Sequence, residues 1–65
     1  MIVADALRAA TERLAASSDT ARLDAELLMA HALECSRSDL LLKRLRDSSP
    51  TRFDALIERR MHHEP

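Results

Sequence analysis

Glu26, His31 and Cys35 are the side chains of this sequence whose types and spacing come closest to a chemical site. His31 and Cys35 are four residues apart, a spacing that brings two metal ligands together on one helix. Two ligands do not close a metal site, and no Cys/His array has zinc-finger spacing. No neighbouring base that would activate the Cys35 thiol is evident. We therefore predict neither a metal site nor a catalytic residue.

Glu26 is the most informative of the three because its neighbours on a helical projection are Ala30 and Leu33. A carboxylate in such surroundings must be paired or reach water, since burying it alone has a high free-energy cost. We predict that a cation from the last helix, Arg59 or Arg60, pairs with Glu26. Such pairs are mostly structural, so we assign this one no chemistry of its own.

The elements that hold these side chains are predicted to be helices alone. The sequence has 65 residues, 46% of them hydrophobic, and contains no glycine. Leucine and alanine favour helices, whereas tight hairpin turns need the backbone freedom of glycine. We predict one small all-α domain with helices over residues 3–16, 20–34, 37–46 and 50–62, packed around the second.

The hydrophobic pattern gives the second helix its central place. The apolar residues of 22–33 lie on nearly every side of a helical projection, which is typical of a helix with neighbours on several faces. The first helix has a single apolar stripe instead: Val3, Leu7, Ala10 and Leu14. Three consecutive leucines, residues 40–42, cannot share one face, so the third helix contacts two neighbours or leaves one leucine to a partner.

Short polar residues mark the expected helix ends. One of residues 19–20 is expected to cap the second helix, and Ser36 with Asp39 imitates a capping box for the third. Ser49 is expected to cap the last helix, with Pro50 as its first residue.

Charge is distributed unevenly along the chain. The net charge is −1. Residues 1–42 carry −3, with four Arg against seven acidic residues, residues 43–60 carry +3, with six cations against three acidic residues, and Glu64 adds −1. An acidic balance argues against wholesale nucleic-acid binding, which needs an electropositive surface. No apolar run of about 18 residues predicts a membrane span, and no signal peptide is recognisable. A single cysteine makes a reducing, cytoplasmic setting the default interpretation.

Two stretches of the sequence resemble a known family. Residues 21–28, ARLDAELL, and residues 31–33, HAL, resemble the R-x-D-A-E-x-L-L stretch in the N-terminal domain of HemK-type methyltransferases, which modify peptide chain release factors on glutamine. Residues 57–65, IERRMHHEP, are similar to that family's R-R-x-x-G-E-P segment, and residues 36–41 to the loop into its third helix. The family has glycine at the position of His63, which leaves the geometry of the exit from the last helix open.

The resemblance implies a two-domain enzyme that uses S-adenosylmethionine to methylate the glutamine of the release factor's Gly-Gly-Gln motif. It implies that residues 1–61 are the helical N-terminal domain, which holds the release factor and packs against the catalytic domain, and that residues 62–65 begin the linker. The glycine-rich loop and the Asn-Pro-Pro-Tyr motif of that catalytic domain are absent from this sequence, so no cofactor-binding or catalytic residue carries over. The candidates for contact with the release factor are basic residues outside the predicted core: Lys43, Arg44, Arg46 and Arg52.

Two other functions stay open at this point. A small nucleic-acid-binding module would use the basic residues 43–60, although the acidic first half and the leucine-rich third helix count against it. A freestanding protein-interaction domain, with no methyltransferase attached, is the other alternative.

Overall fold

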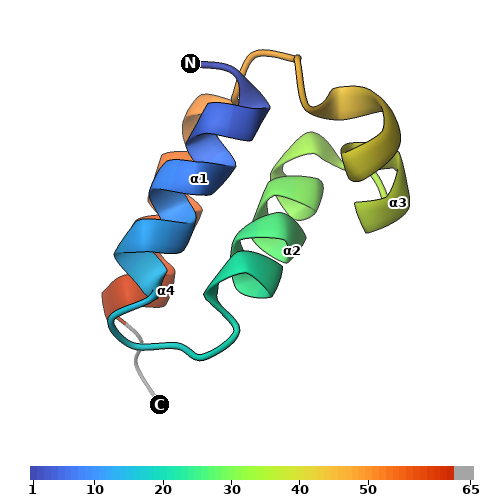
Figure 1. Ribbon diagram of the computed structural model, residues 1–65. Helices are drawn as coiled ribbons and strands as arrows, with labels where there is room; N and C mark the ends of the chain where they lie inside the picture. The colour runs from blue at the N-terminus through green and yellow to red at the C-terminus, as the bar shows by residue number, and fades with distance from the viewer. Residues whose placement is uncertain (63–65) are drawn as a thin grey trace.

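The structure, a computed structural model, describes residues 1–62 and is built from helices. In chain order the elements are α1 (Val3–Leu14), α2 (Ala21–Leu33), α3 (Arg37–Asp39), the π-helical turn η1 (Leu40–Arg44) and α4 (Thr51–His62) (Figure 1). Within residues 1–62 the only strand-like pairing is an isolated bridge between Ile2 and Ser48. The predicted all-α fold is confirmed. No helix in this part of the chain is both long and apolar enough to cross a membrane.

The helices are shorter than the sequence pattern indicated. α1 ends at Leu14 rather than at residue 16, and the predicted third helix is divided into α3 and η1, which ends at Arg44. α4 begins at Thr51, one residue later than predicted, and the Phe53 amide donates to the Pro50 carbonyl at 3.1 Å. Pro50 therefore precedes the helix instead of opening it. The predicted exit at His63 lies outside the described residues.

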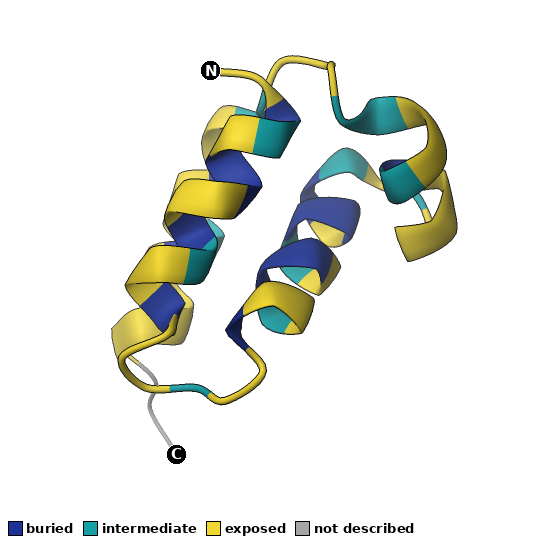
Figure 2. Cartoon of the chain, viewed as in Figure 1, coloured by how far each residue is buried: buried dark blue, intermediate teal, exposed yellow. Residues whose placement is uncertain are grey.

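The core forms where one face of α1 meets α2 and α4. The predicted stripe of α1 is buried along its whole length: Val3, Leu7, Ala10 and Leu14. Phe53 and Ile57 of α4 and Met29 of α2 belong to the same cluster. Figure 2 shows the buried face of α1 turned toward the buried face of α2. Burying each large apolar side chain contributes about 1.5–3 kcal/mol, so this cluster holds the three long helices together.

α2 contacts α1, α3, η1 and α4 and is the central helix of the fold. Its side toward the core carries small residues, with Ala25 fully buried and Ala32 2% exposed, so neighbouring helices approach it closely. The cover is incomplete on the opposite side, where Leu23 and Leu27 are 41% and 50% exposed. The expectation that α2 would be enclosed nearly all round is wrong there, because the other helices pack on the remaining sides.

The C-terminal end of α2 is formed by a residue other than glycine in left-handed conformation. Glu34 has φ 57°, its amide donates to the His31 carbonyl at 3.1 Å, and the Cys35 amide donates to the Ala30 carbonyl at 3.0 Å. This pair of bonds is a common way to end a helix, usually with glycine at the left-handed position. The helix therefore ends before Cys35, so the inference that His31 and Cys35 share one helix is wrong.

The segment after α2 reverses the chain and returns it to the start of α1. The Ser36 hydroxyl accepts the Asp39 amide at 3.0 Å, which confirms the predicted cap of the third helix. Two amides in the first turn of α1 then donate hydrogen bonds to backbone carbonyls of residues 45–47. The Val3 amide donates to the Asp47 carbonyl at 2.8 Å, and the Ala4 amide donates to the Leu45 carbonyl at 2.9 Å. Two of the first-turn amides of α1, which lack partners within the helix, are satisfied in this way.

Candidate docking surface

Glu26 is buried and paired, but with different cations from those predicted. The Glu26 side chain is 7% exposed, and its two oxygens accept from Arg22 Nε and from Arg37 Nε, each at 2.8 Å. Burial by itself raises the pKa of this carboxyl, but the hydrogen bonds and charges of the two guanidinium groups outweigh burial and hold the pKa below its ordinary value. The prediction of Arg59 or Arg60 as partner is wrong, because Glu26 lies on the side of α2 that faces α3.

Arg60 pairs with Asp24 instead. Asp24 accepts from the Ser18 hydroxyl at 2.7 Å, from the Thr20 hydroxyl at 3.4 Å and from Arg60 Nη2 at 3.3 Å. The hydrogen bond from Ser18 is the main reason that the pKa of Asp24 lies below its ordinary value. No side chain caps α2 directly, contrary to the expectation for residues 19–20. Asp24 thus ties together the loop before α2, α2 itself and α4.

Two of the four predicted contact residues are engaged within the domain. Arg52 Nε donates to the Ala32 carbonyl at 2.7 Å, and Arg52 Nη2 lies 2.9 Å from Glu34 Oε2, so this cation stabilises the C-terminal end of α2. Arg44 pairs with Asp47, which raises the pKa of the Arg44 guanidinium. Both side chains therefore form contacts within the domain that the sequence pattern did not indicate.

The other two predicted contact residues, Lys43 and Arg46, are exposed and form no ion pair with any residue between 1 and 62. Both follow the run of three leucines, residues 40–42, in the chain. Leu40 is fully buried and Leu41 is half-buried, but Leu42 is 80% exposed. We call Leu42, Lys43 and Arg46 the η1 knob. An exposed apolar side chain close in the chain to two unpaired cations is suited to contact with an acidic protein surface.

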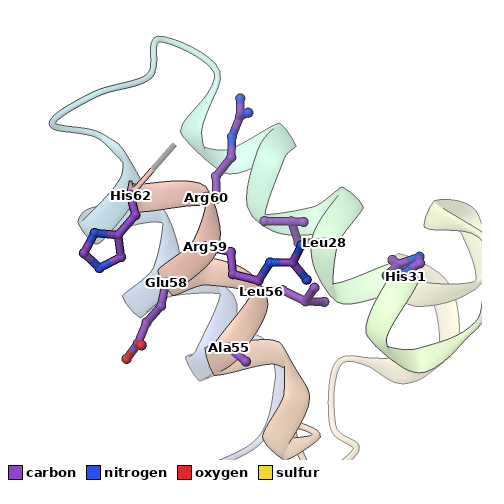
Figure 3. A pocket seen from close by; sticks show the side chains of 8 residues that line it. All are labelled: Leu28, His31, Ala55, Leu56, Glu58, Arg59, Arg60 and His62. Atoms are coloured by element: carbon purple, nitrogen blue, oxygen red, sulfur yellow. The ribbon is translucent and has the colours of Figure 1, made fainter. Parts of the chain in front are cut away.

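A second candidate surface is an open groove between α2 and α4, lined by Leu28, His31, Ala55, Leu56, Glu58, Arg59, Arg60 and His62. Its apolar floor comes from Leu28 of α2 and Leu56 of α4, both half-buried against the core. Figure 3 shows the Arg59 side chain reaching between these two leucines, whereas Glu58 and His62 point away from α2. We call Leu28, Leu56 and Arg59, with Ala55 beside them, the α2–α4 groove. Sequence reasoning missed it because it depends on how two helices pack.

Neither surface carries the elements of a catalytic centre. Among residues 1–62 no three His, Cys, Asp or Glu side chains gather closely enough to hold a metal ion. Cys35 is a half-buried free thiol outside both surfaces. The arrangement is suited to binding another protein through an apolar knob and an apolar groove, each bordered by positive charge.

Comparison with known proteins identifies the same family as the residue resemblance. The family model described as the PrmC N-terminal domain matches residues 5–65. The chain is also 41% identical over 66 aligned residues to a release factor glutamine methyltransferase from Corynebacterium glutamicum. The alignment covers 100% of this chain but only 23% of that relative, so the chain spans about a quarter of its length. No solved structure matches the chain.

The stretches that carry the resemblance also meet in space. Glu26 from the first stretch pairs with Arg37 at the start of α3, and Asp24 from the first stretch pairs with Arg60 from the last. These residues hold the helices in their places and give the family pattern a structural explanation. The chain belongs to the PrmC N-terminal domain family, the helical domain found at the N-terminus of HemK-type methyltransferases.

Proposed function

We propose that this chain is the release-factor-binding domain of an S-adenosylmethionine-dependent methyltransferase that modifies a glutamine side chain of peptide chain release factors. The observation that carries the proposal is the family match over residues 5–65, together with the relative that is a release factor glutamine methyltransferase. The all-α fold and the η1 knob are in keeping with a domain that binds protein and leaves the chemistry to another part of the enzyme.

The methyl donor belongs to that other part. A nucleotide-like cofactor needs a glycine-rich turn between a strand and a helix, because the backbone must approach the ligand closely. This sequence contains no glycine, and residues 1–62 form no strand. The residues at hand therefore do not fit S-adenosylmethionine. We assign the catalytic domain to the chain after the linker that the sequence predicts to start within residues 62–65, of which His62 is still the last residue of α4. We expect the enzyme to be cytoplasmic.

The contribution of the helical domain is positional. A second contact on the substrate protein raises the effective concentration of the glutamine-bearing loop at a distant active site. Lys43 and Arg46 are the charges available for this contact, because Arg44 and Arg52 are already paired within the domain. Leu42 supplies apolar surface at the same place. Charges of this kind act mainly on the association rate and on the orientation of the bound partner.

The test is a charge reversal in the complete methyltransferase. We expect Lys43→Glu with Arg46→Glu to raise the Michaelis constant for the release factor about tenfold at low salt, with kcat unchanged. Methylation of a short peptide that carries only the target glutamine loop should not change, because such a peptide does not reach the helical domain. The matched control is Arg8→Glu with Arg13→Glu, two exposed cations on α1. Equal Michaelis constants for the knob and control variants would remove the η1 knob from the interface.

A further inference from the structure

The α2–α4 groove combines an apolar floor with one directed cation. Leu28 and Leu56 form the floor, and the Arg59 side chain lies between them (Figure 3). Arg59 forms no ion pair with any residue between 1 and 62, whereas its neighbour Arg60 is bound to Asp24 at 3.3 Å. A guanidinium that is held over apolar side chains without a carboxylate partner is prepared to receive one.

The shape and spacing of the groove define the chemistry of what fits it. A groove between two helices accepts the apolar face of a third helix. Arg59 follows Leu56 by three residues, so the cation and the apolar contact stand about one helical turn apart on α4. A docking helix matches both when it carries an aliphatic side chain and an Asp or Glu one turn apart. The carboxylate of Glu58 does not compete, because it points away from α2 (Figure 3).

The charge of the groove also counts against two other occupants, a second copy of this chain and a nucleic acid. In a two-fold contact between copies of this chain, the same patch faces itself, so both Arg59 guanidinium groups would lie within one small interface. Two like charges in one small interface weaken it unless each finds a carboxylate. A nucleic acid would find cations for its phosphates, but the leucine side chains of the floor provide no hydrogen-bond donor to them. An acidic amphipathic helix matches both the apolar floor of the groove and the Arg59 guanidinium.

We propose that the α2–α4 groove docks an acidic amphipathic helix of the protein substrate, with a carboxylate on Arg59 and an aliphatic side chain on Leu28 and Leu56. This inference rests on the proposed function, since it takes the substrate to be the release factor. It adds a second contact, separate from the η1 knob, through which the domain fixes the orientation of the substrate and not only its encounter rate.

The experiment uses two variants of the complete methyltransferase that act on the groove differently. Arg59→Glu reverses the directed cation, and Ala55→Trp fills the groove from an exposed position without touching the core. The matched controls are Arg13→Glu and Ala9→Trp, which make the same changes at exposed positions of α1. Circular dichroism checks that all four variants keep the helical content of the parent enzyme.

Binding of the release factor is measured by titration calorimetry at low and high salt. We expect both groove variants to weaken binding about tenfold at low salt, while the two controls bind as the parent does. The loss for Arg59→Glu should shrink at high salt, and the loss for Ala55→Trp should persist, because only the first is electrostatic.

Other outcomes separate the two proposals. If the groove variants bind normally and the η1 knob variants do not, the groove assignment is wrong and the proposed function stands. If the groove variants and the η1 knob variants all bind the release factor normally, the groove proposal and the proposed function are both wrong. A dimer in sedimentation that Ala55→Trp dissociates would identify a second copy as the occupant and overturn the groove proposal. A fall in the unfolding temperature of the catalytic domain in Ala55→Trp, with normal binding, would identify that domain as the occupant and also overturn it.

Discussion

The ion pairs of Glu26 give the sharpest test of how this small domain is held together. Glu26→Gln keeps the shape of the side chain but removes the charge that two arginines share at 2.8 Å. A hydrogen bond between charged groups contributes about 1.5–3 kcal/mol when it is buried. Because the Arg22 and Arg37 side chains are 50% and 49% exposed, water recovers part of that loss. We expect the substitution to lower the free energy of unfolding by about 2 kcal/mol.

That loss is large for a chain of this size. At about 0.05–0.15 kcal/mol per residue, 65 residues give a total stability of about 3–10 kcal/mol. A domain in this size range loses about 4–8 °C of Tm for each kcal/mol, so we expect Tm to fall by about 8–16 °C. The assay is thermal unfolding followed by far-ultraviolet circular dichroism at several protein concentrations.

The control for this experiment is Glu12→Gln. Glu12 is exposed on α1 and forms no ion pair within residues 1–62, so its change should leave Tm within about 2 °C of the parent. Equal unfolding temperatures for the two variants would show that the Glu26 pairs contribute nothing net to stability. The reasoning from burial and geometry would then be refuted.

The same ion pairs predict a dependence on pH. The pKa of Glu26 in the folded domain lies below its ordinary value of 4.5, so the unfolded chain binds a proton more readily than the folded one. The stabilisation is therefore complete above about pH 4.5 and is lost as the pH falls through the lower folded pKa. The difference in free energy of unfolding between the parent and Glu26→Gln should shrink over that acidic range. A difference that stayed constant from neutral pH to about pH 2 would contradict this account.

Two further predictions concern the junction between α2 and α4. Glu34→Gly should be more stable than Glu34→Ala by about 1 kcal/mol in urea unfolding, because both remove the ion pair with Arg52 but only glycine adopts φ 57° freely. Equal stabilities of the two variants would contradict the left-handed helix end. Arg52→Ala should lower the free energy of unfolding by about 1–2 kcal/mol in thermal unfolding, because it leaves the Ala32 carbonyl and Glu34 without their partner. The control Arg46→Ala should change this free energy little. A similar loss for both variants would show that Arg52 does not cap α2.

The elements of the fold could be predicted where local pattern alone decides them. The stripe of α1 is apolar at helical spacing, and all four of its residues are buried. The Ser36 cap needs only the residues of one turn, and the structure contains it. The end of α2 was harder to place, because a glutamate adopts the left-handed conformation that glycine normally marks. The pattern therefore extended α2 by one residue, to Glu34.

The partners of charged side chains could not be predicted in the same way. Burial of Glu26 followed from its apolar neighbours, but the choice among several arginines depends on which helix lies against which side of α2. Arg37 reaches Glu26 because α3 packs beside α2, and Arg60 reaches Asp24 because α4 packs on another side. The predicted contact set changed for the same reason, since Arg44 and Arg52 find partners within the domain.

The sequence by itself therefore determined the helical class, the core stripe, the need for a partner at Glu26 and the family. These follow from periodicity, burial cost and residue pattern, which act along the chain. Only the tertiary structure decided which cations stay free, that Leu42 is the leucine left exposed, and that Leu28, Leu56 and Arg59 share one groove. The physical reason is that ion pairs and grooves form between helices, and the angle and side at which helices meet depend on the whole core.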